Sequence, residues 1–207
     1  MSLKNVEQLN AVHMDVLREI GNIGSGNAAS SLASLMGVTV DITVPTVKLL
    51  GFSETVEFLG GPEKIAIGML VGLTGDITGM MLYILQKSFA NEMLKAVMGK
   101  EVDDLFELDE MDQSFISEIG NIMAGSYVNA ISSLTGLTID ISVPNLTVDM
   151  VGAILSVPAV EFAKVGDKVL FIDDSFMAGS GEIKSNMILV PETDSLELLF
   201  TKLGVGI

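Results

Sequence analysis

The sequence contains no cysteine and a single histidine, His13, and each shortage removes a class of catalytic site. Without cysteine, the chain can form no disulfide, no thiol nucleophile and no thiolate metal site. One histidine cannot serve two Ser-His-Asp triads, and we interpret His13 as a surface residue and not as a metal ligand. Thiol chemistry and a pair of histidine-dependent triads are excluded.

Basic residues are also scarce, with 11 Lys and Arg against 27 Asp and Glu, which gives a net charge of −16. Proteins that bind nucleic acid depend on Lys and Arg to release counterions from the phosphate backbone. The composition therefore argues against nucleic acid as a partner.

Long apolar runs are missing, although 49% of the residues are hydrophobic. The longest nearly uncharged stretches, around 65–75 and 150–160, are shorter than the roughly 18 to 20 residues that cross a bilayer. The first residues, MSLKNVEQLN, lack the apolar segment of a secretory signal. We expect a cytoplasmic protein with a substantial core and no membrane insertion.

The sequence does contain one motif twice, in copies that lie 99 residues apart. The two segments from Glu to Pro agree at 14 of 27 positions, including polar positions that a shared core has no reason to repeat. The motif positions are Asp15, Glu19, Asn22 and Pro45 in the first copy and Ser114, Glu118, Asn121 and Pro144 in the second. This duplication predicts a single domain of two fused repeats, about 9–99 and 108–204, with an acidic junction at about 100–110.

The first repeat predicts a long helix followed by strands and a second helix. Small and apolar residues recur every three or four positions over Leu9–Met36, and Gly37 suits the end of that helix. The period then changes to two over Val38–Val44, which predicts a half-buried strand that ends at Pro45. Further strands and a helix are expected at Val47–Phe52, Lys64–Gly72, Thr78–Gln86 and Ser88–Met98.

The second repeat has the same order of elements. Its helices are expected at Met111–Thr135 and near Asp194–Leu203, and its strands at Leu137–Val143, Leu146–Val157, Lys168–Asp173 and Lys184–Val190. No helix is expected between successive strands, which indicates a mostly antiparallel sheet packed with long helices. The predicted fold class is α+β with two pseudo-symmetric halves, and the acidic junction is interpreted as a solvated linker.

The polar residues of each copy share one helix face, because positions i, i+4 and i+7 lie on the same side. A Glu there can pair with a cation or act as a base, whereas an Asn amide can hold a water molecule but cannot carry a proton at neutral pH. Glycines surround both asparagines, and each costs about 1 kcal/mol in a helix interior. Close approach of a partner and close helix packing are both possible reasons for them. Met123 stands where the first copy has Gly24, so the two sites need not be equally active.

Two plainer interpretations compete with a catalytic one. A single Glu-x2-Asn pair on a helix is typical of solvated surface, but its repetition at a fixed distance from a proline favours function. The glycines of 21–26 differ in spacing from a nucleotide-binding loop, and they lie within a helix instead of after a strand.

The arrangement Asp/Ser-x3-Glu-x2-Asn-x22-Pro, present twice with EIGNI in both copies, resembles the CheC branch of the CheC/CheX/FliY family. Members of this family dephosphorylate the chemotaxis response regulator CheY. The resemblance covers essentially the whole chain. It implies that Glu19 and Glu118 pair with a lysine of the phosphorylated regulator, and that Asn22 and Asn121 orient the attacking water.

The resemblance also implies supporting residues and partners. Pro45 and Pro144 are expected to shape the chain after a strand, while Asp15 and Ser114 occupy the variable first position and receive no chemistry. No cofactor is expected on this chain, because the Mg²⁺ belongs to the regulator. A phosphorylated CheY-type regulator and the receptor-modifying deamidase CheD are the expected partners.

Two other functions are compatible with the same fold. The flagellar switch protein FliM has a related fold without the phosphatase motif, so the chain could be a non-catalytic interaction module. It could also be a regulator that acts mainly by binding CheD. The intact Glu and Asn pairs favour a phosphatase, which is a hydrolase.

Overall fold

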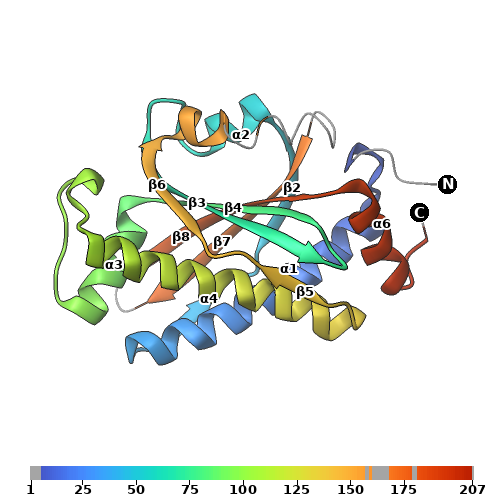
Figure 1. Ribbon diagram of the computed structural model, residues 1–207, viewed down its shortest axis with the longest axis horizontal. Helices are drawn as coiled ribbons and strands as arrows, with labels where there is room; N and C mark the ends of the chain where they lie inside the picture. Colours follow the sequence, from blue (N-terminus) through green and yellow to red (C-terminus); the bar gives the residue numbers. More distant parts are fainter. Residues whose placement is uncertain (1–5, 157–158, 160–167, 179–180, 207) are drawn as a thin grey trace.

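The chain folds into three layers, with one antiparallel sheet between long helices on one face and short helices on the other (Figure 1). The computed structural model describes residues 6–156, 159, 168–178 and 181–206. Within these residues no helix is long and apolar enough to cross a membrane. The antiparallel sheet and its long helices confirm the predicted α+β class.

The first long helix, α1, spans Ala11–Met36 and has a defined cap at each end. Asn10 accepts hydrogen bonds from the backbone N–H groups of Val12 and His13 at 2.9 and 3.2 Å, which satisfies donors that lack partners at a helix start. The helix ends at Gly37, whose φ of +66° lies in the left-handed region that glycine adopts without strain. The predicted end of this helix is confirmed.

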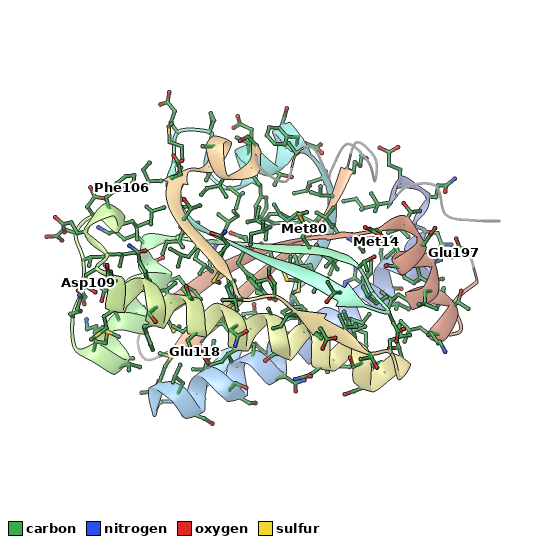
Figure 2. The ribbon with its side chains drawn as sticks, in the orientation of Figure 1. Met14, Met80, Phe106, Asp109, Glu118 and Glu197 are labelled. Carbon is green, nitrogen blue, oxygen red and sulfur yellow. The ribbon has the colours of Figure 1, made fainter. Side chains whose placement is uncertain are left out.

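The second long helix, α4, spans Glu110–Thr135 and begins with a capping box of different composition. The side chains of Asp109 and Asp112 each accept from the other's backbone N–H, at 2.9 and 3.1 Å. Lys100 Nζ lies 2.6 Å from Asp112 Oδ2 and 3.0 Å from Asp109 Oδ2. Figure 2 shows Asp109 at the start of α4. Lys100 thus ties the helix start to the segment before it.

That segment, 100–110, is not the solvated linker that its charge suggested. It contains the 3-10 helix η2 (Leu105–Glu107) and buries Val102, Leu105 and Leu108 in the main core. The Asn91 side chain also pairs with the backbone N–H and C=O of Val102, at 2.9 and 3.0 Å. Apolar residues spaced three apart anchor the segment, while most of its acidic neighbours remain exposed. The acidic composition of the segment therefore gave no sign of its buried residues.

Among the described residues the sheet has eight strands in the order β1-β7-β8-β4-β3-β5, with β2 also paired to β7 and β6 to β3. All the pairings are antiparallel. The strands are β1 (Val40–Ile42), β2 (Thr46–Gly51), β3 (Ile65–Gly75), β4 (Gly79–Leu85), β5 (Ile139–Ile141), β6 (Asn145–Met150), β7 (Lys168–Ala178) and β8 (Gly181–Pro191).

Strands of the two repeats are interleaved within this sheet. β1 and β2 from the first repeat both pair with β7 of the second, while β5 and β6 from the second both pair with β3 of the first. β4 and β8, one from each repeat, pair with each other. Each repeat therefore completes its part of the sheet with strands from the other.

Each motif proline lies at a break between two strands that share one neighbour. Residues 43–45 separate β1 from β2 along β7, and residues 142–144 separate β5 from β6 along β3. Proline has no N–H to donate to a strand ladder, which accounts for the interruption at Pro45 and Pro144. The predicted strand Val38–Val44 is correspondingly short, because only β1 forms ladder pairs there.

The two faces of the sheet have separate cores. The larger core lies under α1, α4, α3 (Lys87–Met98) and α6 (Thr193–Lys202). Successive residues of a strand point to opposite faces, and in β3 Ile67 and Met69 join the larger core whereas Ala66 joins the smaller one. The long helices, and with them the motif residues, are therefore held on one face of the sheet.

Short helices interrupt the strand order where only strands were expected. α2 (Phe52–Phe58) lies between β2 and β3, and residues 151–156 are helical between β6 and β7. The predicted strand Leu146–Val157 is wrong beyond Met150, and Val157 lies outside the described residues. The residues of the second short helix that pack on the sheet have helical spacing and are Val151, Ile154 and Leu155.

Candidate active site

Both long helices present the repeated polar residues at the surface. Glu19 on α1 and Glu118 on α4 are exposed, and Asn22 and Asn121 are half-buried. Within the described part of the chain these four side chains form no hydrogen bond or ion pair, so their polar atoms are available to a partner. Figure 2 shows Glu118 on α4. The structure thus places each Glu and Asn pair on one helix face, as the spacing predicted.

Residues beside the two glutamates differ in charge. In α1 the exposed Asp15 pairs with Arg18, with Oδ1 and Nη1 2.5 Å apart. Ser114 and Ser117 take the equivalent places in α4. Sequence reasoning missed Arg18, although the three-residue spacing of an Asp and an Arg on a helix was a usable signal. A cation therefore accompanies Glu19 in the first site, and a hydroxyl takes its place in the second.

Pro45 holds the first strand break against α1, next to Asn22. It is buried, and its Cγ lies 3.4 Å from the position that a Cβ would take on Gly21. At the equivalent Gly120 a Cβ would overlap the sulfur and terminal methyl of Met69. Close packing of the chain's own atoms thus explains the glycine before each asparagine.

Gly24 allows the two long helices to approach each other. A Cβ there would lie 2.8 Å from Cδ1 and 3.1 Å from Cα of Tyr127 in α4. Met123, which replaces Gly24 in the second copy, is fully buried in the larger core. The exchange of Gly24 for Met123 therefore lies on the packed side of the helices, away from the polar stripe formed by Asp15, Glu19 and Asn22 in α1 and by Ser114, Glu118 and Asn121 in α4.

In the second repeat, the four motif residues surround one hollow of about 330 Å³. A second hollow of about 720 Å³ continues toward the start of α4 and shares Ser114 and Glu118 with the first. The first hollow is lined by Ser114, Ser117, Glu118, Asn121, Ile141, Ser142, Val143 and Pro144. The second is lined by Met98, Glu110, Met111, Ser114, Phe115 and Glu118. The structure thus brings the motif proline to the same space as the Glu and the Asn.

The lining of these hollows suits a positively charged group, such as an ammonium, and a water molecule. It offers the carboxylates of Glu110 and Glu118, the amide of Asn121 and several hydroxyls, and its described residues include no Lys or Arg. A free anion would be repelled there by like charge. Among the described residues, no group of three or more His, Asp or Glu side chains is arranged to hold a metal ion.

His13 is not the surface residue that the sequence suggested. It is 2% exposed, and its ring packs on Phe200 with 4.5 Å between the centroids. Nδ1 accepts from the backbone N–H of Asn10 at 3.1 Å, and Nε2 donates to the carbonyl of Gly206 at 3.2 Å. Because both ring nitrogens are used in capping α1 and holding the chain end, His13 has a structural role.

A buried polar cluster beneath the helices was missed from the sequence. Asp174 in β7 is 2% exposed and accepts hydrogen bonds from Ser25 of α1, at 2.7 Å, and from Tyr127 of α4. Burial raises the pKa of Asp174 to about 6, although both hydrogen bonds oppose the shift. The Tyr83 hydroxyl is also buried, and burial together with the Asp174 charge raises its pKa. No local pattern could have revealed this cluster, because its members come from four separate elements.

Comparison with known proteins decides the family. The profile of the CheC-like family matches residues 12–49 and 111–148, which are the two motif segments. The CheY-P phosphatase CheC of Bacillus subtilis is 39% identical over 199 residues, covering 94% of this chain and 95% of that protein. The chain belongs to the CheC-like family. The resemblance stated from the motif residues is confirmed.

Solved structures place this CheC-like chain among flagellar and chemotaxis proteins of the same fold. Thermotoga maritima FliY matches with a TM-score of 0.76 and 26% identity, over 95% of this chain and 98% of that one. The FliM middle domain of H. pylori matches with a TM-score of 0.68 over 94% of this chain and 99% of that one. At 14% identity, the FliM likeness shows the fold alone.

Proposed function

We propose that this CheC-like chain is a phosphatase that hydrolyses the phosphoaspartate of a CheY-type response regulator. The observation that carries the proposal is the repeated Glu and Asn pair on a helix surface, which in the second copy faces a hollow with Pro144. The relative from B. subtilis, aligned over 94% of this chain, is a CheY-P phosphatase. The family assignment and the free polar side chains support the same function.

In this proposal Asn22 and Asn121 orient the attacking water. The amide has an acceptor and donors, so it can fix the position of a water molecule without taking its proton. A water molecule held in line with the bond between phosphorus and the aspartyl oxygen is already in the geometry for attack, which free water reaches only rarely. A 100-fold acceleration needs about 2.7 kcal/mol off the barrier, which is within reach of positioning alone.

Glu19 and Glu118 pair with a lysine of the regulator and so dock it with its phosphate toward the amide. An exposed carboxylate that has no partner among the described residues suits this role, since pairing breaks none of the described interactions. The described lining offers no Lys or Arg, which supports a regulator that brings its own cations, including Mg²⁺, to balance the phosphate.

The reaction needs no nucleophile or acid from this chain. The water oxygen forms a bond to phosphorus, and the bond from phosphorus to the aspartyl oxygen breaks. Aspartate leaves as a carboxylate, a weak base that requires no protonation, and the protons of the water remain on inorganic phosphate and solvent. An Asn that orients the water and a Glu that pairs with the lysine of the regulator are sufficient for this reaction.

The test is to mix the purified chain with a purified CheY-type regulator that has been phosphorylated with acetyl phosphate and freed of excess donor. Loss of the phosphorylated form and release of inorganic phosphate are followed with time. We expect catalytic amounts of the chain to accelerate both. A rate equal to that of the regulator alone would contradict the proposal and favour a FliM-like interaction module.

Association with a CheD deamidase is a further proposal, based on the family resemblance alone. Co-elution of the two purified proteins from a gel-filtration column tests it. Phosphatase activity and CheD binding are compatible, so the two assays are read separately.

A further inference from the structure

The exposed apolar side chains of this protein follow the internal repeat. Among the described residues, the five most exposed large apolar side chains are Val143 (86%), Met111 (71%), Val44 (70%), Phe106 (63%) and Val12 (56%). Four of these form two pairs separated by the repeat distance of 99 residues, Val12 with Met111 and Val44 with Val143. A core requirement cannot explain the repetition, because these side chains lie in solvent.

In the second repeat, the pair lies at the two ends of the polar stripe. Met111 precedes Glu118 by seven residues, or two helical turns, and lines the larger hollow with it. Val143 lines the smaller hollow together with Glu118 and Asn121. Anything that fills both hollows to reach Asn121 therefore has Met111 on one side and Val143 on the other.

In the first repeat, the equivalent residues stand in the same relation to the motif. Val12 precedes Glu19 by seven residues on α1. Val44 immediately precedes Pro45, in the gap between β1 and β2, and Pro45 rests against the helix at Gly21. Each strand break thus presents an exposed valine immediately before the motif proline.

We propose that Val12 with Val44, and Met111 with Val143, are docking contacts for the face of the phosphorylated regulator that surrounds its phosphoaspartate. This inference rests on the phosphatase function proposed above. The occupant is identified by continuity, since the apolar residues line the hollows that contain Glu118 and Asn121. Beyond the pairing of Glu118 with a lysine, the described lining offers little charge attraction to a phosphorylated protein, which leaves apolar contact to supply further affinity.

Docking contacts of this kind affect binding and leave the chemical step unchanged. They touch the regulator equally before and during phosphoryl transfer, so their loss raises the concentration needed for half-maximal rate without lowering the maximal rate. Loss of one such contact at an interface typically weakens binding by roughly threefold to tenfold.

The test uses Asn22→Ala as a background, so that the second site dominates the measured rate. In this background, Val143→Thr keeps the branched shape and makes the side chain polar, and Met111→Gln does the same for a long one. Single-turnover rates are measured with the chain in excess over a range of concentrations. We expect each variant to raise the half-saturating concentration about threefold to tenfold and to keep the maximal rate within about twofold.

Matched controls lie outside the polar stripe. Val38→Thr and Leu134→Gln change side chains that are 41% and 43% exposed and line neither hollow. Both controls are expected to keep the half-saturating concentration of the background. An equal shift in the controls, an unchanged half-saturating concentration in the test variants, or a loss of maximal rate alone would each overturn the docking assignment.

Failure of this inference is distinguishable from failure of the proposed function. If the parent chain does not accelerate dephosphorylation, the proposed function is wrong and the docking assignment falls with it. If the parent is active and Val143→Thr and Met111→Gln bind the regulator normally, the function stands and only the docking assignment is wrong.

Discussion

Ser25 Oγ on α1 lies 2.7 Å from the hydroxyl oxygen of Tyr127 on α4, so a hydrogen bond joins the two helices that carry the repeated stripes. Both hydroxyls also contact the buried carboxyl of Asp174. Three oxygen-to-oxygen contacts need three hydrogens, and the two hydroxyls supply only two. Below its pKa, Asp174 carries a proton and supplies the third hydrogen by donating to one of the two hydroxyls, which closes a ring; above its pKa, the carboxylate accepts from both hydroxyls. The geometry and the raised pKa of Asp174 therefore agree.

The first prediction is a pH dependence of stability that comes from Asp174. Its pKa is about 6 in the folded protein against an ordinary value of 3.8, so the folded state holds the proton more tightly than the unfolded state. Its contribution to the free energy of unfolding, about 3 kcal/mol, is fully present below about pH 3.8 and is lost as pH rises through about 6. The groups facing it are Ser25, Tyr127 and Tyr83, with Asp173 as the charged neighbour that raises its pKa further.

Asp174→Asn tests this prediction, because an amide can close the same ring of hydrogen bonds without titrating. Urea unfolding is measured for the parent and the variant at intervals from pH 4 to 8. As pH rises toward 6, the free energy of unfolding of the parent should fall relative to that of the variant. Above pH 6 the difference between the two should stay constant. A difference that does not change with pH would show that Asp174 does not titrate in this range.

The second prediction concerns the asparagines. Asn22→Ala and Asn121→Ala should each leave partial phosphatase activity, whereas the double variant should be inactive, because the motif is complete in both copies. Neither side chain makes a hydrogen bond within the described chain, so stability should change by no more than about 0.5 kcal/mol. Circular dichroism confirms folding. Full activity in a folded double variant would remove the asparagines from the mechanism.

The third prediction separates positioning from acid–base chemistry. If Asn orients water and Glu only pairs with a lysine, neither changes protonation during turnover, so the single-turnover rate should be nearly flat from about pH 7 to 9. This range lies above the pKa of Asp174, so its titration does not interfere. Glu19→Gln combined with Glu118→Gln should weaken binding of the regulator. A steep rise with pH in the parent that the Gln variant lacks would identify Glu as a general base.

The fourth prediction uses two glycines of α1 that sit in different surroundings. Gly24→Ala places a Cβ 2.8 Å from the Tyr127 ring and should destabilise the protein by roughly 1–3 kcal/mol, because the helices must move apart. Gly26→Ala has Ile42 as its nearest neighbour at 3.9 Å and should be neutral or stabilising by up to about 1 kcal/mol, because alanine favours a helix. Thermal unfolding of both variants measures the contrast. Equal effects at the two positions would contradict close packing at Gly24.

The fifth prediction is that the isolated chain binds no divalent cation tightly, despite its 27 acidic residues. The Mg²⁺ of the proposed reaction belongs to the regulator, and the described residues offer no cluster with ligand geometry. Isothermal titration with Mg²⁺ and with Zn²⁺ should give no stoichiometric heat at micromolar concentration. A tight one-to-one site would instead indicate metal chemistry on this chain.

Much of the candidate site could be predicted from the sequence because it depends on local geometry. The spacing of Asp15, Glu19 and Asn22 places them on one face of any helix, and the same spacing recurs 99 residues later. Proline interrupts a strand ladder because it lacks an N–H, so the sequence alone was enough to place Pro45 at the end of a strand. The repeat, the long helices and the α+β class followed from the same local rules.

Other features required the folded chain. The short helix at 151–156 was missed because the alternation in β6 was extended across a change to helical spacing. The buried anchors of 100–110 were hidden among acidic neighbours, and His13 became a core residue only because Phe200 and Gly206 reach it from the far end of the chain.

The sequence by itself determined the duplicated motif, the helix faces that display it and the family. Tertiary structure alone decided that the strands of the two repeats interleave, that Pro144 shares a hollow with Glu118 and Asn121, and that Asp174 links the two long helices. The physical reason is the range of the interactions. Helical periodicity acts over a few neighbouring residues, whereas strand pairing, cavity walls and buried hydrogen bonds join residues dozens of positions apart, and only the packed core brings those together.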